Sequence, residues 1–183
     1  GYGSSSNRAA ARDPYGDALH PLTLGSGGAD GWTDAGYLGA PGGGAVKLVV
    51  EGGILTVNGT VTANGSGTAG GNGGAGSGGS IWVIAETLDG SGAFKANGGI
   101  RTDNPGGGGG RIAIYYTDGN FPVGNIANSG ANIQAYGGTS GNYAPAGAGT
   151  IYIKNTDGDP DNLGSLYVDN NVNNGGSAGL AAQ

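Results

Sequence analysis

The chain has 183 residues, of which 46 are glycine, and its formal net charge is −6 with only seven Lys and Arg residues. The absence of Cys excludes disulfide frameworks, thiolate metal sites and cysteine nucleophiles. Scattered cations on an acidic chain argue against a nucleic-acid partner, because phosphate binding requires clustered Lys and Arg. The chain contains no run of about 18 apolar residues, so the sequence predicts no transmembrane helix.

The sequence favours an ordered, exported protein. Charged residues make up only 11% of the chain, and the apolar residues gather into short β-branched and aromatic runs, which is not the pattern of a disordered chain. The absence of both Met and Cys is typical of an exported chain that has been trimmed from a longer precursor. We therefore expect an extracellular or cell-surface location.

Three regions follow one another along the chain. Residues 1–24 lack any repeat, and we expect them to form an arm that exchanges with a neighbouring subunit. The single histidine, His20, lies in this arm beside Pro21 and suits packing better than catalysis, because no nucleophile motif accompanies it. We assign residues 25–171 to a glycine-rich β-repeat domain of about four two-strand units, and residues 172–183 to a tail.

Each repeat unit begins with a glycine-rich connector and a strand-like run. The equivalent first positions of these runs are Ala45, Ser80, Arg111 and Thr150. A second short run follows in each unit, and its equivalent positions are Ala63, Ala96, Ala135 and Val168. A period of roughly 20–50 residues indicates stacked units that share one core, since no unit can bury an apolar face alone.

The alternation of side chains within each run places aliphatic residues on one face, as in 81–84. We therefore expect an all-β fold, namely a β-solenoid similar to a right-handed parallel β-helix, with glycine-rich loops. The alternative is a β-sandwich of consecutive hairpins, with tight turns at 51–53 and 89–91.

The second run of each unit ends in a small residue that suits a tight interior turn. Asn follows this position in several units, at Asn64, Asn97 and Asn170. Because Asn tolerates turn conformations and stacks well, we expect these side chains to form a ladder along the stack.

The glycine tracts 65–79 and 104–110 are either flexible linkers or packed extended segments of polyproline-II form. We favour packed segments. Nucleotide binding is disfavoured, because a strand rather than a helix N-terminus follows each tract.

Few residues suggest chemistry. Asp157, Asp159 and Asp161 place oxygen atoms at alternate positions and are candidate calcium ligands, with a simple polar turn as the alternative. We predict no catalytic residues and no other cofactor. Glu51 and Glu86, the only glutamates, end successive strand runs, and a polysaccharide-active enzyme would need such a pair across a groove.

Tyrosines recur on the strand runs and form either a sugar-binding strip or packing contacts. They are Tyr115, Tyr116, Tyr152 and Tyr167. Tyr is common on half-buried strand faces, so the pattern alone does not separate these roles.

Three stretches, GGGAVKLVVEGGILTVNGTVTANG, GSGGSIWVIAETLDGSGAFKANGG and GGGGGRIAIYY, resemble the glycine-rich repeat regions of very large secreted or surface proteins of bacteria. This resemblance implies stalk, adhesin or matrix roles and brings no catalytic residues. We expect a non-enzymatic subunit of an extracellular filament that polymerises head to tail with itself. The alternatives are a glycan-binding adhesin or stalk module in a cell-surface matrix and, less favoured, a polysaccharide-active β-helix enzyme.

Overall fold

The computed structural model describes residues 15–31, 38–67, 73–102, 104–126, 130–141, 145–159, 161–168 and 170. These residues form strands and no helix. The strands are β1 (Ala45–Thr56), β2 (Thr60–Thr62), β3 (Ser80–Asp89), β4 (Ala93–Lys95), β5 (Arg111–Asp118), β6 (Ile133–Gln134), β7 (Thr150–Asn155) and β8 (Ser165–Tyr167).

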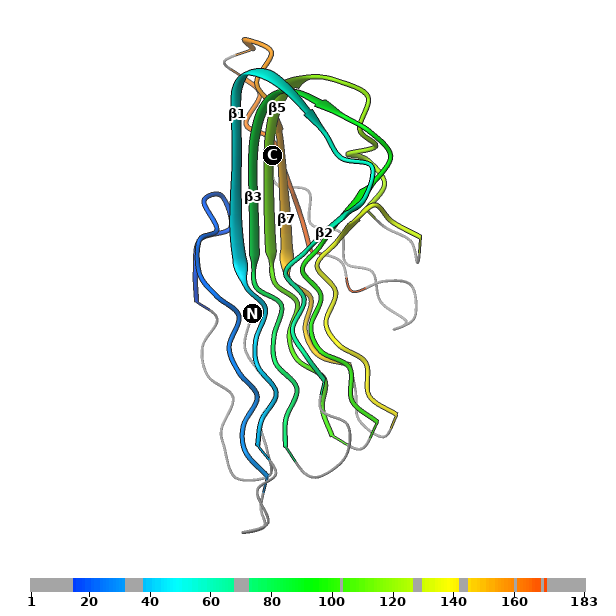
Figure 1. Cartoon of the computed structure of the whole chain (residues 1–183). Helices are drawn as coiled ribbons and strands as arrows, with labels where there is room; N and C mark the ends of the chain where they lie inside the picture. Colours follow the sequence, from blue (N-terminus) through cyan, green and yellow to red (C-terminus); the bar gives the residue numbers. More distant parts are fainter. Residues whose placement is uncertain are drawn as a thin grey trace.

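The first strands of the four repeats lie side by side and parallel in one sheet (Figure 1), whose order is β1-β3-β5-β7-β8. The predicted equivalent positions are direct Cα partners across this sheet: Ala45, Ser80, Arg111 and Thr150. The short strands β2, β4 and β6 form a second parallel sheet. The repeat and its register are therefore confirmed for the first three units.

The hydrophobic core lies between the two sheets. Ile81 and Val83 of β3 and Ile112 and Ile114 of β5 are fully buried, and Phe94 of β4 belongs to the same cluster. The alternation predicted from sequence is confirmed, because these residues share one parity along their strands. Burying each such side chain contributes roughly 1.5–3 kcal/mol.

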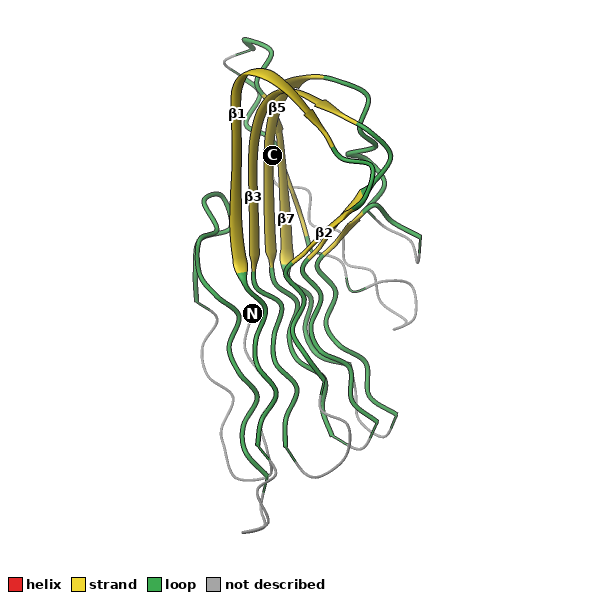
Figure 2. Cartoon of the chain, in the orientation of Figure 1, coloured by secondary structure: helices red, strands yellow, loops and turns green. Residues whose placement is uncertain are grey.

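Below the strands, the glycine tracts run as extended segments beside one another (Figure 2). The N–H groups of Gly76 and Gly79 both donate to segment 63–67, whereas the N–H of Gly78 donates to Gly108. Gly76 and Gly79, which bond to the same neighbouring segment, are three residues apart. Three residues per turn is the period of a polyproline-II helix. In the described ranges the tracts are therefore packed, as predicted, and are not linkers.

Glycine is required in these segments because their backbones approach closely. A Cβ atom added to Gly78 would lie 2.1 Å from the carbonyl oxygen of Ala96, and one added to Gly109 would lie 2.1 Å from that of Ala135. Positive φ angles occur at other glycines, such as Gly52. The packed segments thus select glycine for its small volume and not for its conformational freedom.

The predicted β-solenoid is wrong. The five-stranded sheet is mixed, since β8 pairs antiparallel with β7, and the described chain does not close into a solenoid. Gly158 (φ 95°) and Gly164 (φ 80°) occur in the segment that reverses the chain after β7. The fourth unit therefore folds back as a hairpin instead of adding a strand beside β6.

Two further expectations are also wrong. The alternative β-sandwich of consecutive hairpins fails because β1 and β2, which are consecutive, belong to different sheets. The small residues do not form tight turns, because Ala63 and Ala96 lie where the second strands pass into extended glycine segments. Their carbonyl oxygens each accept a hydrogen bond of 2.7 Å, from Gly79 and Gly110 respectively.

Candidate functional site

Strand β1 forms one edge of the five-stranded sheet, and no strand among the described residues pairs with its outer side. All twelve of its residues are at least partly exposed. Val49 is 46% exposed and Ile54 is 63% exposed, and the charged residues on the strand are Lys47 and Glu51. A long, weakly charged edge of this kind is a template for pairing with another strand.

The direction of the backbone groups on β1 follows from its pairing with β3. The N–H of Ser80 donates to the carbonyl oxygen of Gly44 at 3.0 Å. In a parallel ladder, every second residue bonds to the same neighbour, so Leu48 faces β3 while Lys47 and Val49 direct their N–H and C=O groups outward. The regular edge ends at an irregularity between Val50 and Ile54.

A row of aromatic side chains crosses the outer face of the same sheet. The Lys47 ammonium lies 3.8 Å from the ring centroid of Trp82, which is also in edge contact with His20 at 5.2 Å. His20 stacks on Tyr115 at 6.3 Å, and Tyr115 lies 5.5 Å from Tyr152. Residues 15–24 therefore lie across this face, and His20 has the packing role predicted for it.

Hydrogen bonds hold this part of the N-terminal arm to its own sheet. The Tyr115 hydroxyl donates to the carbonyl oxygen of Leu19 at 2.9 Å, and Ser80 Oγ donates to that of Thr23 at 2.6 Å. Asp17 accepts the backbone N–H of Leu19, which lowers the pKa of this carboxyl. Residues 1–14 lie outside the described ranges, so the predicted exchange of the arm stays a prediction.

The four predicted tyrosines do not form one strip. Tyr115 and Tyr152 lie on the outer face, whereas Tyr116 and Tyr167 pack against the core cluster. Burial, together with the nearby Tyr152 and Asp17, raises the pKa of Tyr115 to about 12. Tyr115 contacts Leu19 and His20, whereas the Tyr152 hydroxyl donates to the carbonyl oxygen of Leu163. These contacts reduce the aromatic surface left for a sugar.

The candidate calcium ligands lie in an exposed turn after β7. The backbone N–H of Asp159 faces the carboxylate of Asp157 at 3.4 Å, and that of Asp161 donates to Asp159 at 2.9 Å. The described residues include no group of three His, Cys, Asp or Glu side chains placed to hold a metal ion. The contacts fit the polar-turn alternative, and calcium binding stays a prediction.

Glu51 and Glu86 lie on neighbouring strands, as the repeat predicts, and both are exposed. Neither side chain lines the cavity of about 260 Å³ beside Arg111 or the groove of about 310 Å³ beside Lys95. Neither of these two hollows is therefore a groove across which this carboxylate pair could cleave a glycoside.

The asparagine ladder predicted from sequence is confirmed as a side-chain-to-backbone ladder. Asn64 Oδ1 accepts the N–H of Asn97 at 2.7 Å, and Asn97 Oδ1 accepts the N–H of Tyr136 at 2.8 Å. Asn170 Oδ1 accepts the N–H of Gly137 at 2.7 Å. Each amide thus links one repeat to the next.

Sequence reasoning missed the burial of two charged residues, Arg101 and Arg111, of which Arg111 lies at the start of β5. The other first positions of the repeat are Ala, Ser and Thr, and this contrast was the available signal.

No protein-family model, curated protein or solved structure matches the chain. The described part of the chain contains no helix with the length and apolar character that a bilayer span requires.

Proposed function

We propose that this chain is a non-enzymatic structural subunit of an extracellular filament and that copies of it join through the free edge of β1. The observation that carries this proposal is the exposed edge of the twelve-residue strand β1, whose backbone groups face outward on alternate residues over its regular part, 45–50. An incoming strand would meet the same pattern of donors and acceptors that β3 presents to β5. The resemblance to repeat regions of bacterial surface proteins supports the same role.

The two edges of the sheet differ, which favours a head-to-tail contact. One edge is the long parallel strand β1, and the other is the three-residue antiparallel strand β8. A contact between unlike surfaces repeats without closing unless its rotation forms a ring. Open filaments are therefore the expected product of this contact.

Negative-stain electron microscopy of the purified chain tests the proposal. We expect uniform fibres with a regular axial repeat. Val49→Pro removes an outward N–H without removing a bond to β3, so it should leave dispersed particles with an unchanged circular dichroism spectrum. The matched control Val49→Thr keeps this N–H and a β-branched side chain, and it should still form fibres. Dispersed particles of the unaltered chain at all concentrations would overturn the proposal.

A glycan-binding module is the second candidate function, and a polar groove of about 310 Å³ beside the three-stranded sheet favours it. Its lining includes Asn58, Thr60, Lys95, Asn132 and Gln134. These side chains supply both donors and acceptors for sugar hydroxyls. Binding of neutral oligosaccharides by dispersed particles, and its loss in Lys95→Ala, would favour this function over the filament.

A further inference from the structure

Arg111 carries a buried positive charge that no described carboxylate neutralises. Its side chain is 4% exposed. Nη1 donates to the carbonyl oxygen of Tyr15 at 2.8 Å and Nη2 donates to Thr23 Oγ1 at 2.7 Å, and both acceptors are neutral. Burial lowers the pKa of the guanidinium. A buried charge without a counter-charge costs several kcal/mol even after relaxation.

A buried hydroxyl without a hydrogen-bond partner, that of Thr150, lies at the position next to Arg111. Thr150 is the Cα partner of Arg111 across β5 and β7, so the two side chains share the outer face. Both Arg111 Nε and Thr150 Oγ1 are buried without a hydrogen-bond partner. Buried polar groups are normally paired, so two orphaned groups at adjacent positions indicate a missing partner.

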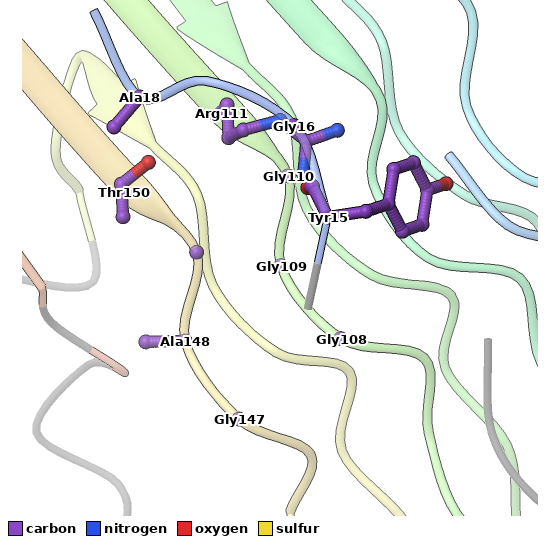
Figure 3. A pocket seen from close by; sticks show the side chains of 11 residues that line it. Tyr15, Gly16, Ala18, Gly108, Gly109, Gly110, Arg111, Gly147, Ala148 and Thr150 are labelled. Atoms are coloured by element: carbon purple, nitrogen blue, oxygen red, sulfur yellow. Dashed lines mark hydrogen bonds between the residues drawn. The ribbon is translucent and has the colours of Figure 1, made fainter. Parts of the chain in front are cut away.

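These groups border a cavity of about 260 Å³. Figure 3 shows segments 108–110 and 147–149 along its walls, with Arg111 and Thr150 where β5 and β7 begin, and Tyr15 nearby. Gly109, Gly110 and Gly149 are packed against neighbouring backbone, whereas a Cβ atom at Gly147 would meet nothing within 4 Å. The cavity is thus large enough for a small charged group and has a cation beside it.

We propose that this cavity binds a carboxylate group, which accepts hydrogen bonds from the Arg111 guanidinium and the Thr150 hydroxyl. A carboxylate matches the planar fork of guanidinium, and its single charge balances one Arg. A doubly charged phosphate would leave an excess negative charge in the same buried place. The carboxylate belongs either to a free small acid or to an acidic side chain of a second copy of this chain.

Sodium acetate added to the dilute full-length protein tests the free-acid source. We expect the ¹⁵N–¹H signal of Arg111 Nε to shift in a saturable way and the melting temperature to rise, whereas sodium chloride at equal ionic strength should do neither. Thr150→Val should weaken this response about tenfold by removing one hydrogen bond to a charged group. In Arg111→Lys, the rise in melting temperature on adding acetate should be weakened at least as much. Arg101→Lys, at an equally buried arginine away from the cavity, should leave both readouts unchanged.

A series of increasing protein concentrations without acetate tests the second source, an acidic side chain of another copy of this chain. If a second copy supplies the carboxylate, the Arg111 Nε signal should shift as subunits associate, and acetate should compete with association. The proposal is overturned if neither acetate nor association moves this signal. Thr150→Val keeps Arg111, so it remains informative if Arg111→Lys does not fold. The proposed fibre formation through the edge of β1 is tested separately by Val49→Pro, so it does not depend on whether the carboxylate proposal holds.

Discussion

At the residue scale, the glycines of this chain differ in how closely neighbouring backbone packs against them. Gly43 and Gly44 are adjacent, yet a Cβ at Gly43 would lie 2.0 Å from the carbonyl oxygen of Ala63, while one at Gly44 would meet nothing within 4 Å. The sequence predicted that glycine tracts pack together. It did not distinguish these two positions, because the difference depends on which neighbouring segment passes each Cα.

This difference predicts opposite effects of the same substitution. Gly43→Ala should lower the free energy of unfolding by about 1–3 kcal/mol or more, since backbone must move to admit the methyl group. Gly44→Ala should change it by less than about 1 kcal/mol, in the stabilising direction, because the unfolded chain loses freedom. Urea denaturation measures both, and equal destabilisation would contradict the packed arrangement.

The outer-face tyrosine gives a pH prediction. Burial raises the pKa of Tyr115 from 10.0 to about 12, so between these values the unfolded chain binds fewer protons than the folded one. Stability should therefore be unaffected by this group below pH 10 and should fall as the pH rises from 10 towards 12. In Tyr115→Phe the fall should be shallower, as measured by urea midpoints across this range. An unchanged slope would show that Tyr115 does not titrate with folding.

At the element scale, pairing between repeats was predictable and the final strand was not. The register of β1, β3, β5 and β7 follows from glycine-rich connectors that precede equivalent first positions, so aligning the repeats aligned the strands. β8 departs because the chain reverses before it, in a segment that includes Gly158 and Gly164 at positive φ. In sequence, these glycines look like any others in a glycine-rich chain.

The asparagine ladder allows a test of coupling between repeats. Asn97→Ala removes the acceptor of the Tyr136 N–H and the donor to Gln134 Oε1. A partly buried N–H left unsatisfied should cost about 1–3 kcal/mol in the free energy of unfolding. Asn64→Ala is the matched control and should cost less, because Asn64 is exposed and water can replace it. A larger loss for Asn64→Ala would contradict this account.

At the scale of the whole molecule, each repeat contributes strands to the sheets and an extended glycine segment below them. The strands of successive repeats therefore lie side by side, and so do their glycine segments (Figure 1). The sequence predicted stacked repeats but led to a closed solenoid, because strand patterns do not reveal where extended glycine segments continue. The Arg111 cavity was not predictable either, since it depends on residues 15–24 crossing a sheet that begins far along the chain.

The free edge of β1 makes a prediction that separates a dispersed subunit from an assembled one. In dilute protein, the amide of Leu48, which faces β3, should exchange its hydrogen slowly, and those of Lys47 and Val49 should exchange rapidly. In fibres, all three should exchange slowly, because an added strand would accept the outward N–H groups. The alternation along one strand is an internal control for local unfolding, which would affect neighbours equally. Persistent rapid exchange at Lys47 and Val49 in fibres would mean that the copies join elsewhere.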